Sequence, residues 1–192
     1  MKKKFSKKDI IKYLGEVNKK LEQRGKFGEL VLCGGAVFTL IYETRNSTRD
    51  IDAVFNPREE LKEIIDEITR ENNLDSQWLN DDVSMFTVEF KNLTSSEYLR
   101  LSHLTVGVLK AETLLSMKLI SARTDTYDLD DTVTLIKHLK IKKVEELYAM
   151  IERCEFPLHP TALKISENFA KQAFDVYMKN NPEFLHGQEA NT

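Results

Sequence analysis

A glycine pair, Gly34-Gly35, separates two apolar segments of different character. The segment that leads into it, "ELVLCG" (29–34), is short and apolar and predicts a buried strand. The segment that follows, "AVFTLIYET" (36–44), predicts a short helix that is apolar nearly all round and therefore buried. Glycine at such a junction lets the backbone turn tightly and lets a ligand come close to it. Plain strand-to-helix turns also use glycine.

Two aspartates, Asp50 and Asp52, open the next apolar segment, "DIDAVF" (50–55), which predicts a second strand. Side chains alternate along a strand, so both carboxylates should lie on one face, opposite Ile51. Two close carboxylates repel each other unless a cation lies between or in front of them. Mg²⁺ commonly uses one or two carboxylates together with substrate phosphates, and the start of the helix near Ala36 would favour a phosphate. Alternatively, both aspartates lie at a solvated strand start.

The remaining segments predict the fold class. Helical periodicity recurs at residues 7–24, 58–73, 110–123, 128–139, 142–154 and 160–180. A strand is predicted at 84–90, and 99–109 predicts one more strand or a bent pair of strands. This order predicts an α/β (α+β) fold, with a mixed sheet flanked by helices in residues 1–109 and a helical part in residues 110–180 packed on it. Residues 181–192 are polar and predict a loose tail.

Composition excludes several classes of protein. The net charge of −3 over 192 residues gives no general attraction to nucleic acid or to an anionic membrane. The start, "MKKKFSKK", either contacts a phosphate backbone or is a solvated terminus. Cys33 and Cys154 are too few for a disulfide framework or a thiolate zinc site. No apolar stretch approaches membrane-spanning length, and we expect a cytoplasmic protein without membrane partners.

The spacing of the glycine pair and the Asp-x-Asp resembles the signature of the polymerase-β-like nucleotidyltransferase superfamily. More narrowly, four segments resemble a little-characterised bacterial family of nucleotidyltransferase-like proteins, which is related to the toxins of abortive-infection toxin–antitoxin systems. They are "CGGAVF", "RNSTRDIDAVF", "WLND" and "LLSMKLISARTDTYDLDDTVTLIKHL". The resemblance spans roughly residues 28 to 140.

The resemblance implies roles for particular residues. The backbone N–H groups of Gly34 and Gly35 would hold a triphosphate, and Asp50 and Asp52 would ligate Mg²⁺ as catalytic residues. Further contacts to the nucleotide would come from the hydroxyls of Ser47 and Thr48, from Arg49 and from Arg123. Lys118 and Asp131 would belong to the nucleotide site as further catalytic residues.

Purely structural alternatives remain for several of these residues, and for Asp128 and Trp78 as well. The segment "NST" (46–48) can serve as a plain turn. Lys118 can extend along its stem to solvent, and Asp128 can be a helix N-cap. Trp78 is either a core or loop anchor or stacks on a base. Many superfamily members have a third carboxylate on a neighbouring strand, but Glu89 and Asp81 each lack the expected context.

The leading functional prediction is a Mg²⁺-dependent nucleotidyltransferase. It would move a nucleotide from a nucleoside triphosphate to a hydroxyl of RNA, protein or a small molecule, in one version as a toxin with a cognate antitoxin. The alternative is a catalytically weak or inactive module of the same fold that binds nucleotide or a partner. A third option is a structural protein in which both motifs are incidental.

Overall fold

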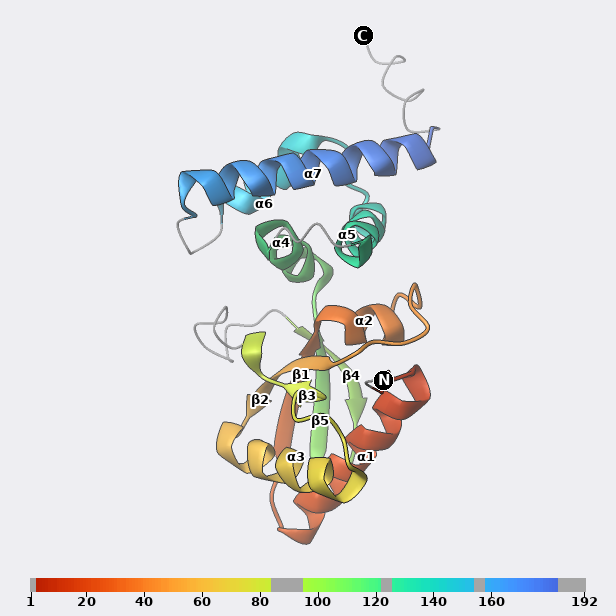
Figure 1. The fold of residues 1–192 in the computed structure, drawn as a ribbon, viewed down its shortest axis with the longest axis vertical. Coiled ribbons are helices and arrows are strands. Elements are labelled where there is room, and N and C mark those ends of the chain that lie inside the picture. Colours follow the sequence, from red (N-terminus) through yellow and green to blue (C-terminus); the bar gives the residue numbers. More distant parts are fainter. Residues whose placement is uncertain (1–2, 84–94, 122–125, 154–157, 183–192) are drawn as a thin grey trace. The chain divides into compact units, whose positions relative to one another are not determined.

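A computed structural model describes residues 3–83, 95–121, 126–153 and 158–182 (Figure 1). The chain divides into two compact units, Met1–Lys110 and Ala111–Thr192. Within the described ranges, no helix combines the length and the apolar character needed to cross a membrane.

One mixed sheet forms the centre of the first unit. The described strands are β1 (Gly28–Cys33), β2 (Ile51–Asn56), β3 (Leu79–Asn80), β4 (Ser95–Arg100) and β5 (Leu104–Leu109), in the spatial order β3-β2-β1-β5-β4. β1 is antiparallel to β2 and parallel to β5, and β3 runs parallel to β2 at one edge. The central strand β1 is buried at every position except Glu29, as its apolar sequence predicts.

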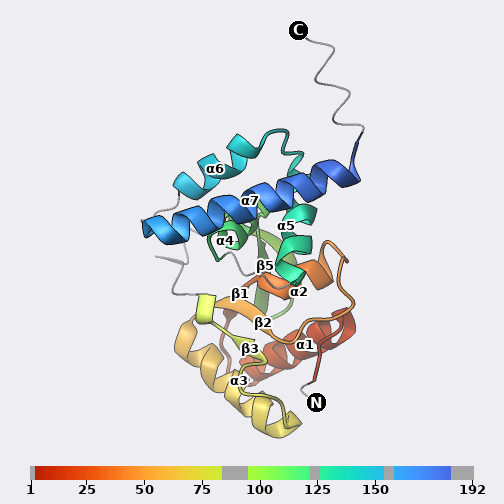
Figure 2. The ribbon, with the colours of Figure 1, turned by 45° about the horizontal axis from the view of Figure 1, so that its top comes forward.

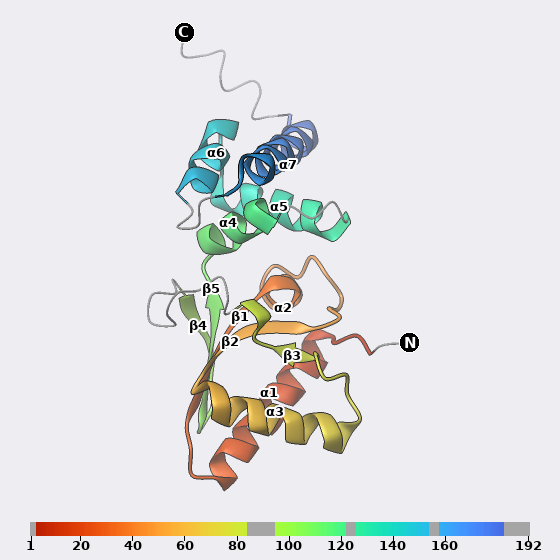
Figure 3. The same cartoon turned by 60° about the vertical axis from the view of Figure 1, so that its left-hand side comes forward.

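Two amphipathic helices, α1 (Lys7–Gln23) and α3 (Arg58–Asn72), pack against each other and run along the sheet (Figure 3). A capping box between Ser6 and Asp9 begins α1, and Arg24 at its end forms an ion pair of 2.6 Å with Glu60 of α3. Each helix buries one apolar stripe. These stripes are Ile10, Tyr13, Leu14, Val17 and Leu21 of α1, and Leu61, Ile64, Ile65 and Ile68 of α3.

The short helix α2 (Gly34–Leu40) follows β1 without a connecting loop, at the end of the sheet where β2 begins (Figure 2). It begins on the glycine pair itself, two residues before the predicted start, and ends at Leu40. Its residues from Ala36 to Leu40 are all buried, so the prediction of a buried helix is confirmed. The chain then takes ten residues to reach β2.

The second unit is helical in its described part. α4 (Ala111–Ser121), α5 (Thr126–Leu139) and α6 (Val144–Glu152) each pack against the long helix α7 (Pro160–Asn180). The predicted α/β fold class with a helical second half is therefore confirmed. The segment 99–109 is the bent pair that the sequence allowed, although its first strand begins earlier, at Ser95. The predicted strand at 84–90 lies outside the described residues, as does the tail beyond residue 182.

Candidate functional site

The first glycine of the pair lies against Asp52. Asp52 is paired with Cys33, the last residue of β1, in the antiparallel ladder of β1 and β2. This register brings the Asp52 side chain to Gly34, whose φ is +58°. A Cβ atom added to Gly34 would overlap Oδ2 of Asp52. Glycine is required here both for the left-handed backbone conformation and to make room for the carboxylate.

The second glycine, Gly35, is covered by the loop between α2 and β2. A Cβ atom added to Gly35 would overlap Oγ1 of Thr48 and lie 3.1 Å from Nη1 of Arg45. The Arg45 guanidinium also lies 5.6 Å from the centre of the Phe38 ring. The position that a Cβ atom of either glycine would take is thus filled by other side chains of the chain. Phosphate binding by the backbone N–H groups of Gly34 and Gly35 stays a prediction.

Thr48 is buried and ties this loop to the N-terminal segment. Its N–H donates to the Phe5 carbonyl at 2.9 Å, and the Phe5 N–H donates to the Thr48 carbonyl at 2.7 Å. The Phe5 ring is itself buried against Tyr13 and Trp78, with ring centres 5.9 and 5.8 Å away. Thr48 is therefore part of an isolated β-bridge rather than of a simple turn.

Trp78 is a core residue. Its side chain is 1% exposed, and its Nε1–H donates to Oγ1 of Thr69 at 2.8 Å. Its backbone carbonyl accepts a hydrogen bond of 2.8 Å from the N–H of Ile51, which holds the start of β2. The alternative in which Trp78 stacks on a base is wrong, because the ring is buried.

Asp50 and Asp52 differ in their surroundings. Asp50 is exposed and lies one residue before β2, whereas Asp52 is half-buried within the strand. Ser47 is half-buried and Arg49 is exposed in the same loop. The shared binding of one cation by the two aspartates stays a prediction.

Asn80 is a site residue that the sequence analysis missed. It lies opposite Asp52 in the parallel pairing of β2 and β3, and its Nδ2 donates to Oδ1 of Asp52 at 3.1 Å. The only signal in the sequence was its place in the "WLND" segment, in which Asp81 was the residue considered as a possible third carboxylate.

Asp81, one of the two candidates for a third carboxylate, is paired with α3. It is 7% exposed, accepts a hydrogen bond from Nε of Arg58, and lies 3.6 Å from Nζ of Lys62. Burial alone would raise the pKa of this carboxyl, but the Arg58 hydrogen bond and the two positive charges outweigh it and hold the pKa below its usual range. Its charge is thus balanced within the fold.

The second candidate, Glu89, lies outside the described residues. Among the residues that the structure describes, no three His, Cys, Asp or Glu side chains are grouped so that they could hold a metal ion.

In the second unit, Lys118 forms a buried ion cluster with two aspartates. Nζ of Lys118 lies 2.8 Å from Oδ2 of Asp131 and also forms an ion pair with Asp128. The three side chains are 14%, 2% and 12% exposed, respectively. Lys118 therefore does not extend to solvent. Asp128 lies in the first turn of α5, which begins at Thr126, so the N-cap alternative is also wrong.

The structure thus brings together Lys118 of α4 and Asp131 of α5, both of which the family resemblance had singled out. Arg123, the other basic candidate, lies outside the described residues. The roles of Lys118 and Asp131 toward a nucleotide stay predictions.

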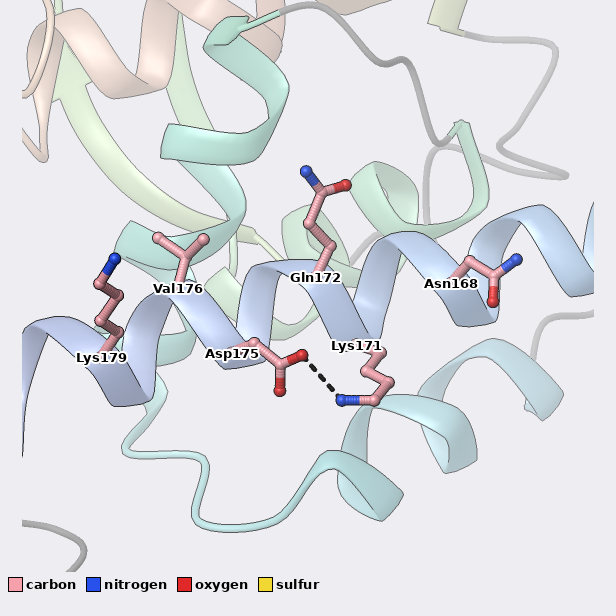
Figure 4. A pocket seen from close by; sticks show the side chains of 6 residues that line it. All are labelled: Asn168, Lys171, Gln172, Asp175, Val176 and Lys179. Atoms are coloured by element: carbon pink, nitrogen blue, oxygen red, sulfur yellow. Dashed lines mark hydrogen bonds and ion pairs between the residues drawn. The ribbon is translucent and has the colours of Figure 1, made fainter.

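A hollow on α7 contains none of these residues. It is lined by the side chains of Asn168, Lys171, Gln172, Asp175, Val176 and Lys179 (Figure 4). Lys171 and Asp175, one turn apart, form an ion pair of 2.7 Å. These side chains lie along one stripe of a single helix, and all of them except the half-buried Val176 are polar and exposed.

Comparison with known proteins assigns the family. Residues 9–165 match the family described as "Nucleotidyltransferase of unknown function (DUF6036)". No curated protein sequence matches the chain at a significant level. The fold is similar to the crystal structure of an antigenic nucleotidyltransferase-like protein from Paracoccidioides brasiliensis, with a TM-score of 0.50 and 13% identity over 98% of this chain and 95% of that one. Because the family match covers most of the sequence, the chain belongs to this nucleotidyltransferase family of unknown function.

Proposed function

We propose that this protein transfers a nucleotide from a nucleoside triphosphate to a hydroxyl group. The observation that carries the proposal is the placement of Asp52, whose carboxylate lies against Gly34 while the Asn80 amide donates to it. This arrangement puts an oriented carboxylate directly beside a turn that starts a helix. Membership of a nucleotidyltransferase family supports the same reaction class.

The oxygen donors at this end of the sheet fit a hard divalent cation. Asp50 and Asp52 would hold Mg²⁺, with the remaining ligand positions filled by phosphate oxygens and water. When bound, Mg²⁺ would neutralise phosphate charge and help to align an attacking hydroxyl for in-line displacement. Asn80 would orient Asp52, and the backbone N–H groups of Gly34 and Gly35 would bind phosphate oxygens.

Loop side chains complete this proposed site. Arg45 lies beside Gly35 and carries a permanent positive charge that suits a phosphate. Ser47 and Thr48 belong to the same loop. Lys118, Asp131 and Arg123 of the second unit are proposed as further nucleotide contacts. The acceptor would be a hydroxyl of RNA, protein or a small molecule, and a toxin-like action held in check by an antitoxin is one form of the proposal.

Transfer of label from nucleoside triphosphates tests the proposal. The purified protein is incubated with Mg²⁺, each of the four α-³²P-labelled triphosphates, and pools of cellular RNA or protein. We expect label to enter one pool, and Asp52→Asn to lower the rate about 100-fold or more because a metal ligand is lost. Asp66→Asn, an exposed acid on α3, is the matched control and should keep the rate. Equal labelling by Asp52→Asn would contradict the proposal.

A second candidate function is nucleotide binding with little or no transfer. The pairing of Asp81 with Arg58 and Lys62 favours it, because that acid is already engaged by α3. Mg²⁺-dependent nucleotide binding without labelling of any acceptor would support this candidate over the first.

A further inference from the structure

Asn80 occupies the position next to Asp52 on the neighbouring strand. β3 pairs with β2 in parallel, and the register sets Asn80 opposite Asp52. Side chains at paired positions of adjacent strands lie on the same face of a sheet. The residue closest to the Asp52 carboxylate on this strand is therefore a neutral amide and not an acid.

The orientation of the amide is determined by its other hydrogen bonds. Oδ1 of Asn80 accepts from the backbone N–H of Asp82 at 3.1 Å, and Nδ2 also approaches the carbonyl of Gln77 at 3.4 Å. The NH₂ group is thus the part that faces Asp52, at 3.1 Å from its Oδ1. An NH₂ group carries hydrogen-bond donors and no lone pair for a cation.

Asp81, the next residue along the chain, does not supply the carboxylate that Asn80 lacks. Asp81 is buried and balanced by Arg58 and Lys62 of α3. Among the residues that the structure describes, the predicted cation site therefore has two carboxylates, of which Asp50 is exposed to water. Mg²⁺ gives up its water shell reluctantly, and with one or two carboxylates it relies on substrate phosphates for its remaining ligands.

We propose that Asn80 makes cation binding at Asp50 and Asp52 depend on the nucleotide, so that the cation arrives and leaves with the triphosphate. Asn80 is a positioning residue: its amide holds Asp52 in place but adds no negative charge. The inference rests on the proposed function and goes beyond it, since it states how the chain acquires its cation.

Binding of Mn²⁺ tests this inference. Mn²⁺ held by the protein is measured by equilibrium dialysis, first with Mn²⁺ alone and then with the α,β-methylene analogues of the four nucleoside triphosphates, which chelate Mn²⁺ equally on both sides of the membrane. The wild-type chain should bind Mn²⁺ alone at least about 10-fold more weakly than in the presence of one analogue.

Two substitutions at Asn80 test its lack of charge and its orienting role separately. Asn80→Asp should tighten the binding of Mn²⁺ alone by about 10-fold or more, because it adds a third carboxylate. Asn80→Ala should weaken Mn²⁺ binding in the presence of the analogue by about 10-fold, as expected when a ligand loses its orienting partner. Asn168→Asp, which adds the same charge on an exposed part of α7, should change neither value. Melting temperatures show whether each variant is folded.

The outcomes distinguish the inference from the proposed function. If the wild type binds Mn²⁺ equally well with and without nucleotide, or if Asn80→Asp leaves the affinity for Mn²⁺ alone unchanged, the inference is wrong while the proposed function stands. If Asn80→Asp does not fold, an unchanged affinity in Asn80→Ala overturns the inference in the same way. If the wild type binds neither Mn²⁺ nor any analogue, the proposed function itself fails.

Discussion

At the scale of single residues, Gly34 and Gly15 allow a matched comparison of glycine-to-alanine substitutions. Gly34 combines a left-handed φ with the close approach of Asp52, whereas a Cβ on Gly15, inside α1, would meet nothing within 4 Å. We expect Gly34→Ala to lower the free energy of unfolding by about 2 kcal/mol, and Gly15→Ala to raise it by about 0.5 kcal/mol. Urea denaturation measures both. Equal effects of the two substitutions would contradict the assigned role of Gly34.

The Asp81 carboxyl should make the free energy of unfolding depend on pH. The pKa of its carboxyl lies below the usual value of about 3.9 because Arg58 and Lys62 outweigh the effect of burial. A lowered pKa in the folded state stabilises the fold above the pKa of the unfolded chain, and this stabilisation is lost as the pH falls through the folded pKa.

We therefore expect Asp81→Asn to lower the free energy of unfolding at neutral pH by about 1 kcal/mol, a modest value because Arg58 is half exposed. The difference from the wild type should shrink once the pH falls below about 4. Urea denaturation at a series of pH values measures this difference. A difference that stays constant from neutral to strongly acidic pH would rule out the ion pair as its source.

The sequence could identify the glycine pair and the aspartates but not their neighbours. Gly34, Asp50 and Asp52 form a spacing pattern that is visible in one dimension. Arg45 approaches this site only through loop folding, and Asn80, although it belongs to the "WLND" segment, reaches Asp52 only through strand register. For the same reason, the contact between Gly35 and Thr48 could not be predicted.

Among the elements, the N-terminal segment supports the loop that leads to β2. Phe5 is paired with Thr48 through two backbone hydrogen bonds, and its ring is buried. We expect Phe5→Ala to lower the free energy of unfolding by about 3 kcal/mol and to speed hydrogen exchange at the Thr48 amide. Leu14→Ala, at a buried site of α1, should destabilise the fold comparably without a selective effect on Thr48. If both variants speed exchange there equally, Phe5 has no special link to this loop.

Lys118 links α4 to α5 through two ion pairs. Its ammonium group is the cation paired with Asp128 and Asp131. Lys118→Ala should lower the free energy of unfolding by about 3 kcal/mol, since two carboxylates would stay largely buried without this partner. Lys137→Ala, on the exposed side of α5, is the control and should have little effect. Thermal unfolding followed by circular dichroism measures both, and unchanged stability of Lys118→Ala would show that the cluster is not structural.

The elements themselves were predictable to different degrees. α1, α3 and α7 follow strong helical periodicity, and each lies within a few residues of its predicted range. The start of β4, "SSEY", was missed because it is polar and lies at the sheet edge, where a strand needs no apolar alternation. The order of strands was not predictable either, because β1 pairs with β5 across more than 70 residues of intervening sequence.

At the scale of the whole molecule, the family match extends over residues of both compact units. The residues proposed for nucleotide transfer likewise come from both. Asp50, Asp52 and Asn80 belong to the first unit, and Lys118 and Asp131 belong to the second. A nucleotide that binds the folded chain and not the unfolded one should raise the free energy of unfolding.

The most direct test of the central claim is the melting temperature with Mg²⁺ and each nucleoside triphosphate. A ligand present at about 100 times its dissociation constant stabilises a protein by about 2.7 kcal/mol, which is several degrees. We predict such a rise for at least one triphosphate, only when Mg²⁺ is present, and its loss in the Asp50→Asn/Asp52→Asn double variant. A rise of the same size in the double variant would contradict the claim that these two aspartates bind the cation and its nucleotide.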